Sequence, residues 1–156
     1  VKPHQVTLVP DKPNAITSNS GWNTIKNCSF LKEIISELSL NSIRTSIFLD
    51  PNIKFIDSAA KTGADRIELY TEFYSKKFEL NPNIAISNYI STANEAINFG
   101  LGINAGHDLN LKNIEFFSSR IPNLLEVSIG HALICESLYL GLENVINLYK
   151  SKLSKN

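Results

Sequence analysis

The sequence predicts an α/β protein: a (β/α)8 (TIM) barrel of which this chain carries roughly the last five βα units, as a single domain over its 156 residues. Strand and helix patterns alternate five times, which is typical of a parallel sheet with right-handed crossovers. Each predicted strand has one apolar and one mixed polar face, whereas strands of an open, doubly wound sheet are apolar on both. A complete barrel typically takes about 250 residues.

The first unit opens with a strand over Gln5–Val9, which Pro10 ends. Residues 11–23 are rich in Pro, Asn, Ser and Gly and show no periodicity. Because this segment is long for a βα loop, we expect it to act as a lid over a site. A helix is predicted over residues 28–38, where apolar residues recur at helical spacing.

The second and third units repeat this order. A strand is predicted over Arg44–Leu49, and Asp50-Pro51 predicts the start of a helix, with Asp as the N-cap and Pro at the first helical position. Gly63 is expected to end that helix. A third strand is predicted over Arg66–Tyr70, and residues 71–83 are expected to form an irregular connection that carries aromatic side chains.

The last units follow the same alternation. The predicted elements are a helix over residues 84–99, a strand over 101–105, a short helix over 111–118 and a strand over 124–129. Residues 132–153 are predicted to be a helix or a helix pair, with a break at Gly141. The carboxyl ends of the two final strands therefore each deliver a glycine and a histidine to one rim, where barrel enzymes bind their ligands.

The strand faces differ in character. One face carries Val6, Leu8, Ile47, Leu49, Ile67, Leu69, Ile103, Ala105, Val127 and Ile129. The other carries Gln5, Thr7, Ser46, Asp50, Glu68, Tyr70, Asn104, Glu126 and Ser128. A barrel interior lined with functional groups explains the second set, yet five strands cannot close an eight-stranded barrel. Since the chain also begins at Val1 and contains no Met, we expect it to be the C-terminal part of a longer protein.

The composition excludes some classes of partner. Lys+Arg and Asp+Glu both number 15, so the net charge is zero and gives no electrostatic case for nucleic acid or an anionic membrane. No apolar run approaches membrane-spanning length, and no signal peptide is visible. Cys28 and Cys135 lie far apart in helical patterns, and we expect buried free thiols in a reducing cytoplasm.

Two residue pairs at strand ends are candidates for chemistry. His107 fits a general acid or base, since imidazole titrates near neutrality; a loop histidine bonded to backbone is the alternative, and its place at the rim favours function. Gly130-His131 opens a helix, so free N–H groups there suit an anion; a tight turn that needs glycine for geometry alone is an equal alternative.

Two further residues are weaker candidates. Glu68 lies on the polar face, where a carboxylate needs a partner or has a raised pKa. A functional role and a structural ion pair inside the barrel are equally compatible with its position. Thr17, in the expected lid, carries a hydroxyl that a ligand could use, but without further argument it is a loop threonine.

Five stretches, taken together and in order, resemble the pyridoxine 5'-phosphate synthase family over the whole chain. They are LVPDK at 8–12 with Thr17, SIFLD at 46–50, GADRIEL at 63–69, GINAGH at 102–107 and IGHALI at 129–134. The Asn-Ala-Gly-His and Ile-Gly-His stretches are specific in combination, while either alone would be weak. The resemblance implies a TIM-barrel enzyme of vitamin B6 synthesis.

The resemblance also implies a reaction and its site. The family condenses 3-amino-2-oxopropyl phosphate with 1-deoxy-D-xylulose 5-phosphate, closes a pyridine ring, and releases phosphate and water without a metal or an organic cofactor. By similarity, His107 matches the proton donor and Thr17 a contact to deoxyxylulose phosphate. Gly130 and His131 match the amino-ketone phosphate site, and Glu68 matches a characteristic glutamate of the barrel. The family forms homo-oligomers whose neighbours contribute to the site.

The sequence departs from the family pattern at three places. Asp108 stands where the family commonly has a glycine whose backbone touches the amino-ketone substrate, and a carboxylate beside a phosphate is repulsive unless it points away. Residues 68–72 read ELYTE, where relatives often have Glu-x-His-Thr-Gly. The first three strands of the family, with a catalytic histidine and a catalytic glutamate, have no counterpart here.

The sequence therefore predicts the C-terminal portion of a pyridoxine 5'-phosphate synthase. Two alternatives remain open: another phosphate-binding TIM-barrel synthase that acts on a sugar phosphate, and a half-barrel module without catalysis. Because a five-strand piece would expose two sheet edges, we expect the 156-residue chain alone to be inactive.

Overall fold

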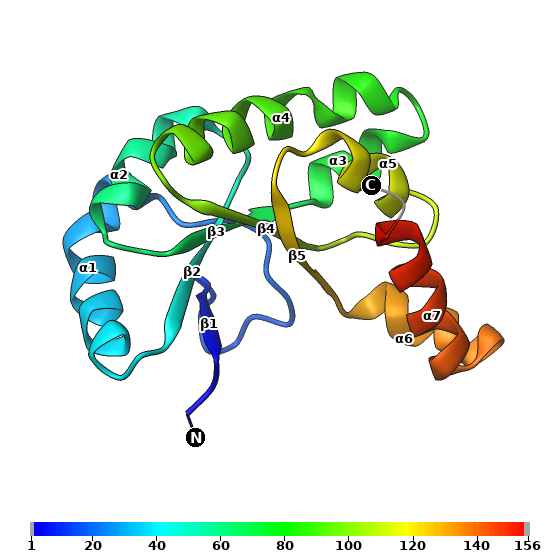
Figure 1. Ribbon diagram of the computed structural model, residues 1–156, viewed down its shortest axis with the longest axis horizontal. Helices are drawn as coiled ribbons and strands as arrows, with labels where there is room; N and C mark the ends of the chain where they lie inside the picture. Colours follow the sequence, from blue (N-terminus) through cyan, green and yellow to red (C-terminus); the bar gives the residue numbers. More distant parts are fainter. Residues whose placement is uncertain (1, 155–156) are drawn as a thin grey trace.

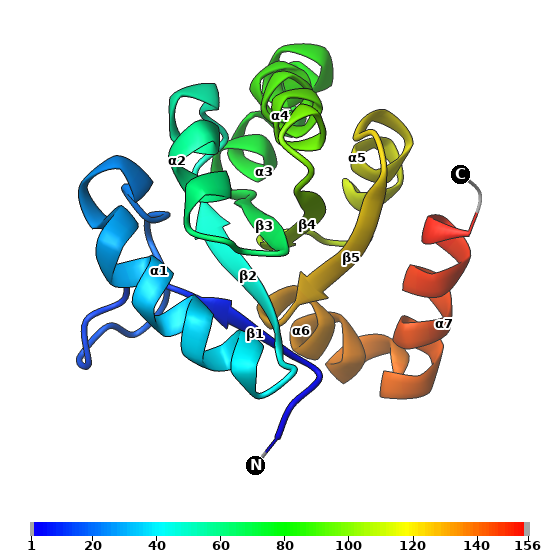
Figure 2. The same cartoon turned by 60° about the vertical axis from the view of Figure 1, so that its left-hand side comes forward.

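The computed structural model describes residues 2–154 and has a five-stranded parallel sheet in the order β1-β2-β3-β4-β5. The strands are β1 (Gln5–Leu8), β2 (Arg44–Leu49), β3 (Arg66–Tyr70), β4 (Gly102–His107) and β5 (Leu124–Ile129). The sheet curves, with helices along its outer side (Figures 1 and 2). Sequential strands that neighbour each other in a curved parallel sheet form a half-barrel, which confirms the predicted fold class.

The helices connect the strands as the alternation predicts. They are α1 (Thr24–Leu40), α2 (Ile56–Lys61), α3 (Glu72–Phe78), α4 (Pro82–Asn98), α5 (Ile114–Arg120), α6 (His131–Leu140) and α7 (Leu142–Leu153), with a 3-10 turn at Ile53–Phe55. Asn23 caps α1 and Asn81 caps α4, each accepting a backbone N–H three residues on. Gly141, with a φ of +81°, separates α6 from α7 and confirms the predicted break.

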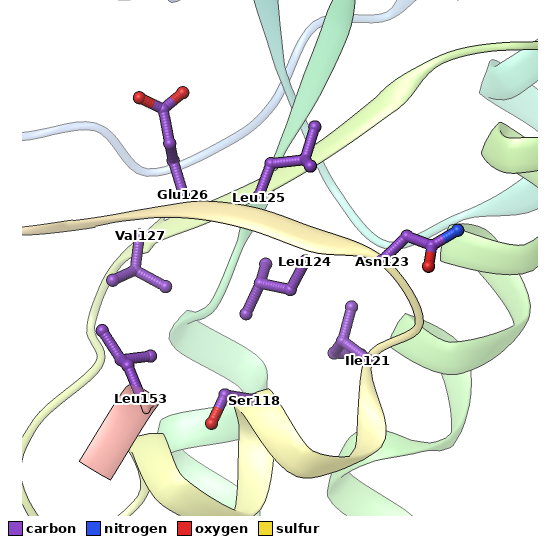
Figure 3. Close-up of a pocket in the computed structure, with 8 residues that line it drawn as sticks. All are labelled: Ser118, Ile121, Asn123, Leu124, Leu125, Glu126, Val127 and Leu153. Atoms are coloured by element: carbon purple, nitrogen blue, oxygen red, sulfur yellow. The ribbon is translucent and has the colours of Figure 1, made fainter. Parts of the chain in front are cut away.

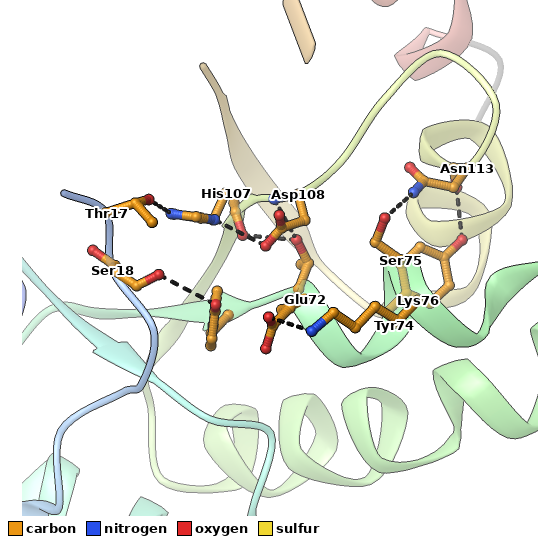
Figure 4. Close-up of polar contacts among 12 residues, drawn as sticks. Thr17, Ser18, Glu72, Tyr74, Ser75, Lys76, His107, Asp108 and Asn113 are labelled. Atoms are coloured by element: carbon orange, nitrogen blue, oxygen red, sulfur yellow. Dashed lines mark hydrogen bonds and ion pairs between the residues drawn. The ribbon is translucent and has the colours of Figure 1, made fainter. Parts of the chain in front are cut away.

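Two local predictions were wrong. The helix after β2 does not start at Asp50-Pro51: Asn52 caps the 3-10 turn, while the Asp50 carboxylate accepts the N–H of Gly21 at 3.2 Å. Residues 71–83 are not irregular, because they contain α3. Its Tyr74 is fully buried and donates its hydroxyl to the carbonyl of Asn113, an anchor that Figure 4 shows beside the functional site.

The apolar faces of the strands pack outward against the helices, as predicted. Ile47, Ile67 and Ile103 on the three central strands are fully buried there, together with Leu31 of α1 and Tyr89 of α4. Each large apolar side chain removed from water contributes about 1.5–3 kcal/mol to folding. This layer fixes the strands, so that their polar faces line the concave side.

The amino ends of the strands are joined by a polar network on the concave side. The Glu126 carboxylate of β5 pairs with Arg66 of β3 and, at 3.4 Å, with Arg44 of β2. Arg66 also donates to Asn104 Oδ1 at 3.1 Å, and Arg44 donates to Gln5 Oε1 at 2.7 Å. The network links all five strands, so the polar side chains at the amino ends of the strands have a structural role. The carboxyl-terminal rim is then the end at which a ligand is expected.

The cysteine prediction was wrong in part. Neither cysteine is in a disulfide, but Cys28 is only half-buried and Cys135 is exposed on α6. Cys28 Sγ lies 3.7 Å from the carbonyl oxygen of Ser58, which joins α1 to α2. Within residues 2–154, no helix has the length and apolar character needed to cross a membrane.

Candidate active site

A cavity of about 440 Å³ opens at the carboxyl-terminal rim of the sheet. It is lined by Thr7, Val9, Ser18, Phe48, Glu68, His107, Ser128, Ile129, Gly130 and His131. Four of the six residues predicted to form a site therefore line one cavity: Glu68, His107, Gly130 and His131. The other two, Thr17 and Asp108, contact His107 from either side.

His107 is the last residue of β4, two residues beyond the predicted end of that strand. Its side chain is only 20% exposed, and its two ring nitrogens have different partners. Nε2 lies 2.7 Å from Thr17 Oγ1, and Nδ1 lies 2.8 Å from Asp108 Oδ2 (Figure 4). The ring also meets Tyr70 edge-on, with centroids 5.3 Å apart. These contacts hold one imidazole in a defined orientation at the cavity wall.

The backbone of His107 is strained, and Thr71 holds it. Its φ is +93°, which is uncommon for a residue with a side chain and tends to occur at functional sites. The fully buried Thr71 hydroxyl donates to the carbonyl of Gly106 at 2.7 Å and accepts the N–H of Asp108 at 3.1 Å. One side chain thus binds the peptide groups on both sides of His107. Thr71 could not be identified from the sequence, because no local pattern pairs it with a residue on the next strand.

Glu68 projects from β3 into the cavity and is 7% exposed. Burial raises the pKa of its carboxyl group, while hydrogen bonds from Thr7 and Ser128 act in the opposite direction. The Thr7 hydroxyl donates to Oε2 at 3.0 Å. A Cβ atom at Gly106 would lie 2.7 Å from Oε1 and 2.9 Å from the backbone oxygen of Ser128, so glycine leaves room for this carboxyl group. Glu68 has no interior basic partner among these contacts, which favours the functional interpretation over an ion pair.

Gly130 and His131 lie where β5 passes directly into α6. The first intrahelical bond here runs from the Ile134 N–H to the Gly130 carbonyl, and no side chain caps the helix. The preceding N–H groups are therefore available to an anion. A Cβ atom at Gly130 would meet nothing within 4 Å, so open space lies beside it. The rings of His107 and His131 are 6.1 Å apart, as expected for neighbouring strand ends.

The loop between β1 and α1 closes over this rim from one side. Besides Thr17, its Ser18 carbonyl accepts the Tyr70 hydroxyl at 3.2 Å. Burial raises the pKa of Tyr70 to about 12, so its phenol stays a donor at neutral pH. The loop returns to the body at Trp22, whose ring N–H donates to the Leu8 carbonyl at 3.0 Å. A Cβ atom at Gly21 would lie 2.3 Å from the Asp50 nitrogen, so glycine is required where the loop meets β2.

A second cavity, of about 490 Å³, lies beside β5 between α5 and the end of α7 (Figure 3). Its walls are mainly apolar side chains, including Ile121, Leu124, Val127 and Leu153. The one carboxylate at its border, Glu126, points to the opposite side of the strand. This cavity has no group for acid–base chemistry. In the part of the chain that the structure describes, no set of three or more His, Cys, Asp or Glu residues is placed to hold a metal ion.

Comparisons with known proteins identify the relatives of this chain. The family described as "Pyridoxal phosphate biosynthesis protein PdxJ" matches residues 1–155. The pyridoxine 5'-phosphate synthase of Flavobacterium johnsoniae is 60% identical over 97% of this chain and 64% of its own length. The enzyme of that name from Cytophaga hutchinsonii is 57% identical over 99% of this chain and 65% of its own. The chain thus spans just under two thirds of these curated relatives.

Among solved structures, a chain of the Amycolatopsis orientalis BexX/CysO complex aligns with a TM-score of 0.59 and 12% identity. The alignment covers 97% of this chain and 56% of that one, and at this identity it supports the fold alone. The family match, by contrast, extends over nearly every residue described above. The chain belongs to the PdxJ family of pyridoxal phosphate biosynthesis proteins.

Proposed function

We propose that the protein containing this chain is a pyridoxine 5'-phosphate synthase, which condenses 3-amino-2-oxopropyl phosphate with 1-deoxy-D-xylulose 5-phosphate to give pyridoxine 5'-phosphate, phosphate and water. One observation carries the proposal. A histidine, a carboxyl group with a raised pKa and an uncapped helix N-terminus border one cavity, as proton transfer on a phosphorylated substrate requires. The names of the relatives support pyridoxine 5'-phosphate as the product.

The residues divide the work as follows. His107 donates a proton through Nε2, the nitrogen on the side of the Thr17 loop. Glu68 exchanges a proton with the substrate, since it lines the cavity and burial raises the pKa of its carboxyl group. Thr17 contacts deoxyxylulose phosphate, and Gly130 with His131 binds the amino-ketone phosphate. The loop over the rim limits the access of water during the reaction.

In this scheme Asp108 reaches the amino-ketone substrate through His107 and not through its own N–H group. That N–H already donates to Thr71 at 3.1 Å, and the carboxylate is turned to His107. We further propose a homo-oligomer that works in the reducing cytoplasm on small phosphorylated molecules, without a metal or an organic cofactor. The free thiols Cys28 and Cys135 are in keeping with that compartment.

The test is a product assay with the whole purified gene product. Pyridoxine 5'-phosphate should form only when both named substrates are present. Replacing deoxyxylulose phosphate with other sugar phosphates tests the alternative of a different phosphate-binding synthase. Binding of either substrate without turnover would favour a non-catalytic half-barrel module and would contradict the proposal.

Residues 1–156 expressed alone should make no pyridoxine 5'-phosphate, as the sequence predicts. Within residues 2–154 the sheet has two edge strands, β1 and β5, and the concave side is open between them. Half a barrel cannot exclude water from the rim or supply groups from other strands. The assay above, run on this piece beside the whole gene product at equal concentration, measures the difference. Turnover by the piece would contradict the prediction.

Gly130→Val should weaken binding of the amino-ketone phosphate more than that of deoxyxylulose phosphate. A Cβ atom at Gly130 meets nothing within 4 Å, and the valine side chain should cover the N–H groups that begin α6. Losing one or two charge-assisted hydrogen bonds of about 1.5–3 kcal/mol each predicts at least a tenfold rise in Kd. Calorimetric titration with each substrate measures it, and equal weakening of both would place the phosphate elsewhere.

A further inference from the structure

Asp108 and His107 form a pair that the backbone alone does not explain. Thr71 fixes the peptide groups around His107, but it leaves the imidazole free to rotate about its side-chain bonds. Besides Thr17 at Nε2, a contact at Nδ1 is needed to set the ring. Asp108 supplies it, because its Oδ2 lies 2.8 Å from Nδ1, with the two side chains 33% and 20% exposed.

The hydrogen-bonding capacity of the three side chains assigns each a role. An ionised carboxylate can only accept, so Nδ1 of His107 carries a proton toward Asp108. In the neutral ring Nε2 is then the acceptor, and the Thr17 hydroxyl at 2.7 Å donates to it. In the protonated ring Nε2 donates instead. In both states the nitrogen that exchanges its proton is Nε2.

The position of the carboxylate avoids the substrates. His107 lines the rim cavity and Asp108 does not, and in Figure 4 the imidazole lies between Asp108 and Thr17. A carboxylate that faced the cavity would repel a phosphate, whereas behind the ring it is hydrogen-bonded to the imidazole. The Asp108 side chain is thus placed to act through His107 rather than on the ligand.

We propose that Asp108 is a positioning residue that fixes the tautomer and orientation of His107, so that Nε2 is the nitrogen presented for proton transfer. The inference rests on the proposed function, since it gives this pair a part in that reaction. The arrangement follows the logic of other pairs in which a carboxylate orients a histidine and selects its tautomer.

The experiment combines ring ¹⁵N–¹H NMR with steady-state kinetics on the whole gene product, in the wild type and in Asp108→Ala, Asp108→Asn and Asp108→Glu. The His107 signals are assigned by their loss in His107→Asn. The wild type should show a protonated Nδ1 and a bare Nε2. Asp108→Ala should shift the ring toward the Nε2-protonated tautomer, and Asp108→Asn, nearly the same size but uncharged, should shift it in the same direction.

The kinetic effect should be confined to turnover. Asp108→Ala and Asp108→Asn should lower kcat by about 10- to 100-fold, less than the roughly 10²–10⁴-fold contributed by an acid–base group itself. KM for both substrates should stay within about threefold. Asp108→Glu, which keeps the carboxylate, should recover part of kcat and of the wild-type tautomer.

Three outcomes would overturn the proposal: a wild-type ring protonated only on Nε2, a tautomer unchanged in Asp108→Ala, or a changed tautomer with an unchanged kcat. No product from the wild type would overturn the proposed function instead. The ring signals are recorded without substrate, so they decide the positioning role of Asp108 separately.

Discussion

His107→Asn should lower kcat of the whole gene product by about 10²–10⁴-fold, the usual contribution of a general acid or base. The variant removes the ring whose Nε2 lies 2.7 Å from Thr17, and asparagine cannot exchange a proton in its place. Asparagine is the suitable replacement because it tolerates the positive φ of this position better than most residues. The measurement is initial-rate kinetics with both substrates, alongside thermal unfolding.

The matched control for this variant is His4→Asn, the same substitution at an exposed position before β1. It should leave kcat unchanged, since it lies at the amino end of the sheet, away from the rim. Activity of His107→Asn within a few-fold of the wild type would show that His107 is not the proton donor. A large fall in the melting temperature would instead assign it a structural role.

Glu68→Gln should trade activity against stability. Gln has nearly the same volume and keeps an oxygen that can accept the hydrogen bond from Thr7. It cannot take up or release a proton, so kcat should fall by at least about 10²-fold. At pH 7 the variant should unfold at a higher temperature than the wild type, because a buried carboxylate is costly in its charged form.

The pH dependence of that gain has a definite sign. Burial raises the pKa of Glu68 in the folded state above that in the unfolded chain. The wild type therefore loses stability relative to the variant as the pH rises from the ordinary glutamate pKa through the raised one. The difference in melting temperature should therefore be largest near pH 7 and vanish below the ordinary glutamate pKa. Glu33→Gln, an exposed change on α1, should show no such difference. A destabilised Glu68→Gln at pH 7 would contradict the assignment.

Strand positions could be predicted because burial on one face leaves a period-two pattern. The bounds of β2, β3 and β5 coincide with those expected, and the outward isoleucines Ile47 and Ile67 are in the core. The helix α3 could not be predicted in the same way. It has only seven residues, and Tyr74 is held by Tyr89 and Phe117, which lie far along the sequence.

The predicted start of the helix after β2 was wrong for a related reason. Asp50-Pro51 has the composition of a helix start, but the Asp50 carboxylate is used by Gly21, 29 residues earlier. Asn52 then takes over as the cap. The local sequence does not show that a distant residue binds the side chain of Asp50. Capping propensity alone therefore selects the wrong residue.

At the site, residues that end strands could be predicted and the contacts between them could not. His107 and Gly130 could be predicted as site residues because parallel strands bring their carboxyl ends to one rim. The hydrogen bond from Thr17 joins residues 90 apart, and the clamp by Thr71 joins β3 to β4 across the sheet. Such contacts depend on the register of neighbouring strands, which the spacing of residues does not encode.

The hydrogen bond between Thr17 and His107 also makes ligand entry a competition. In the structure the Thr17 hydroxyl lies 2.7 Å from Nε2, so under the proposed function an incoming substrate would have to displace it before the imidazole could exchange a proton. A net hydrogen bond of about 0.5–1.5 kcal/mol lowers apparent affinity by up to roughly tenfold. Under the same proposal, the hydrogen bond would keep Nε2 occupied until a ligand displaced the Thr17 hydroxyl.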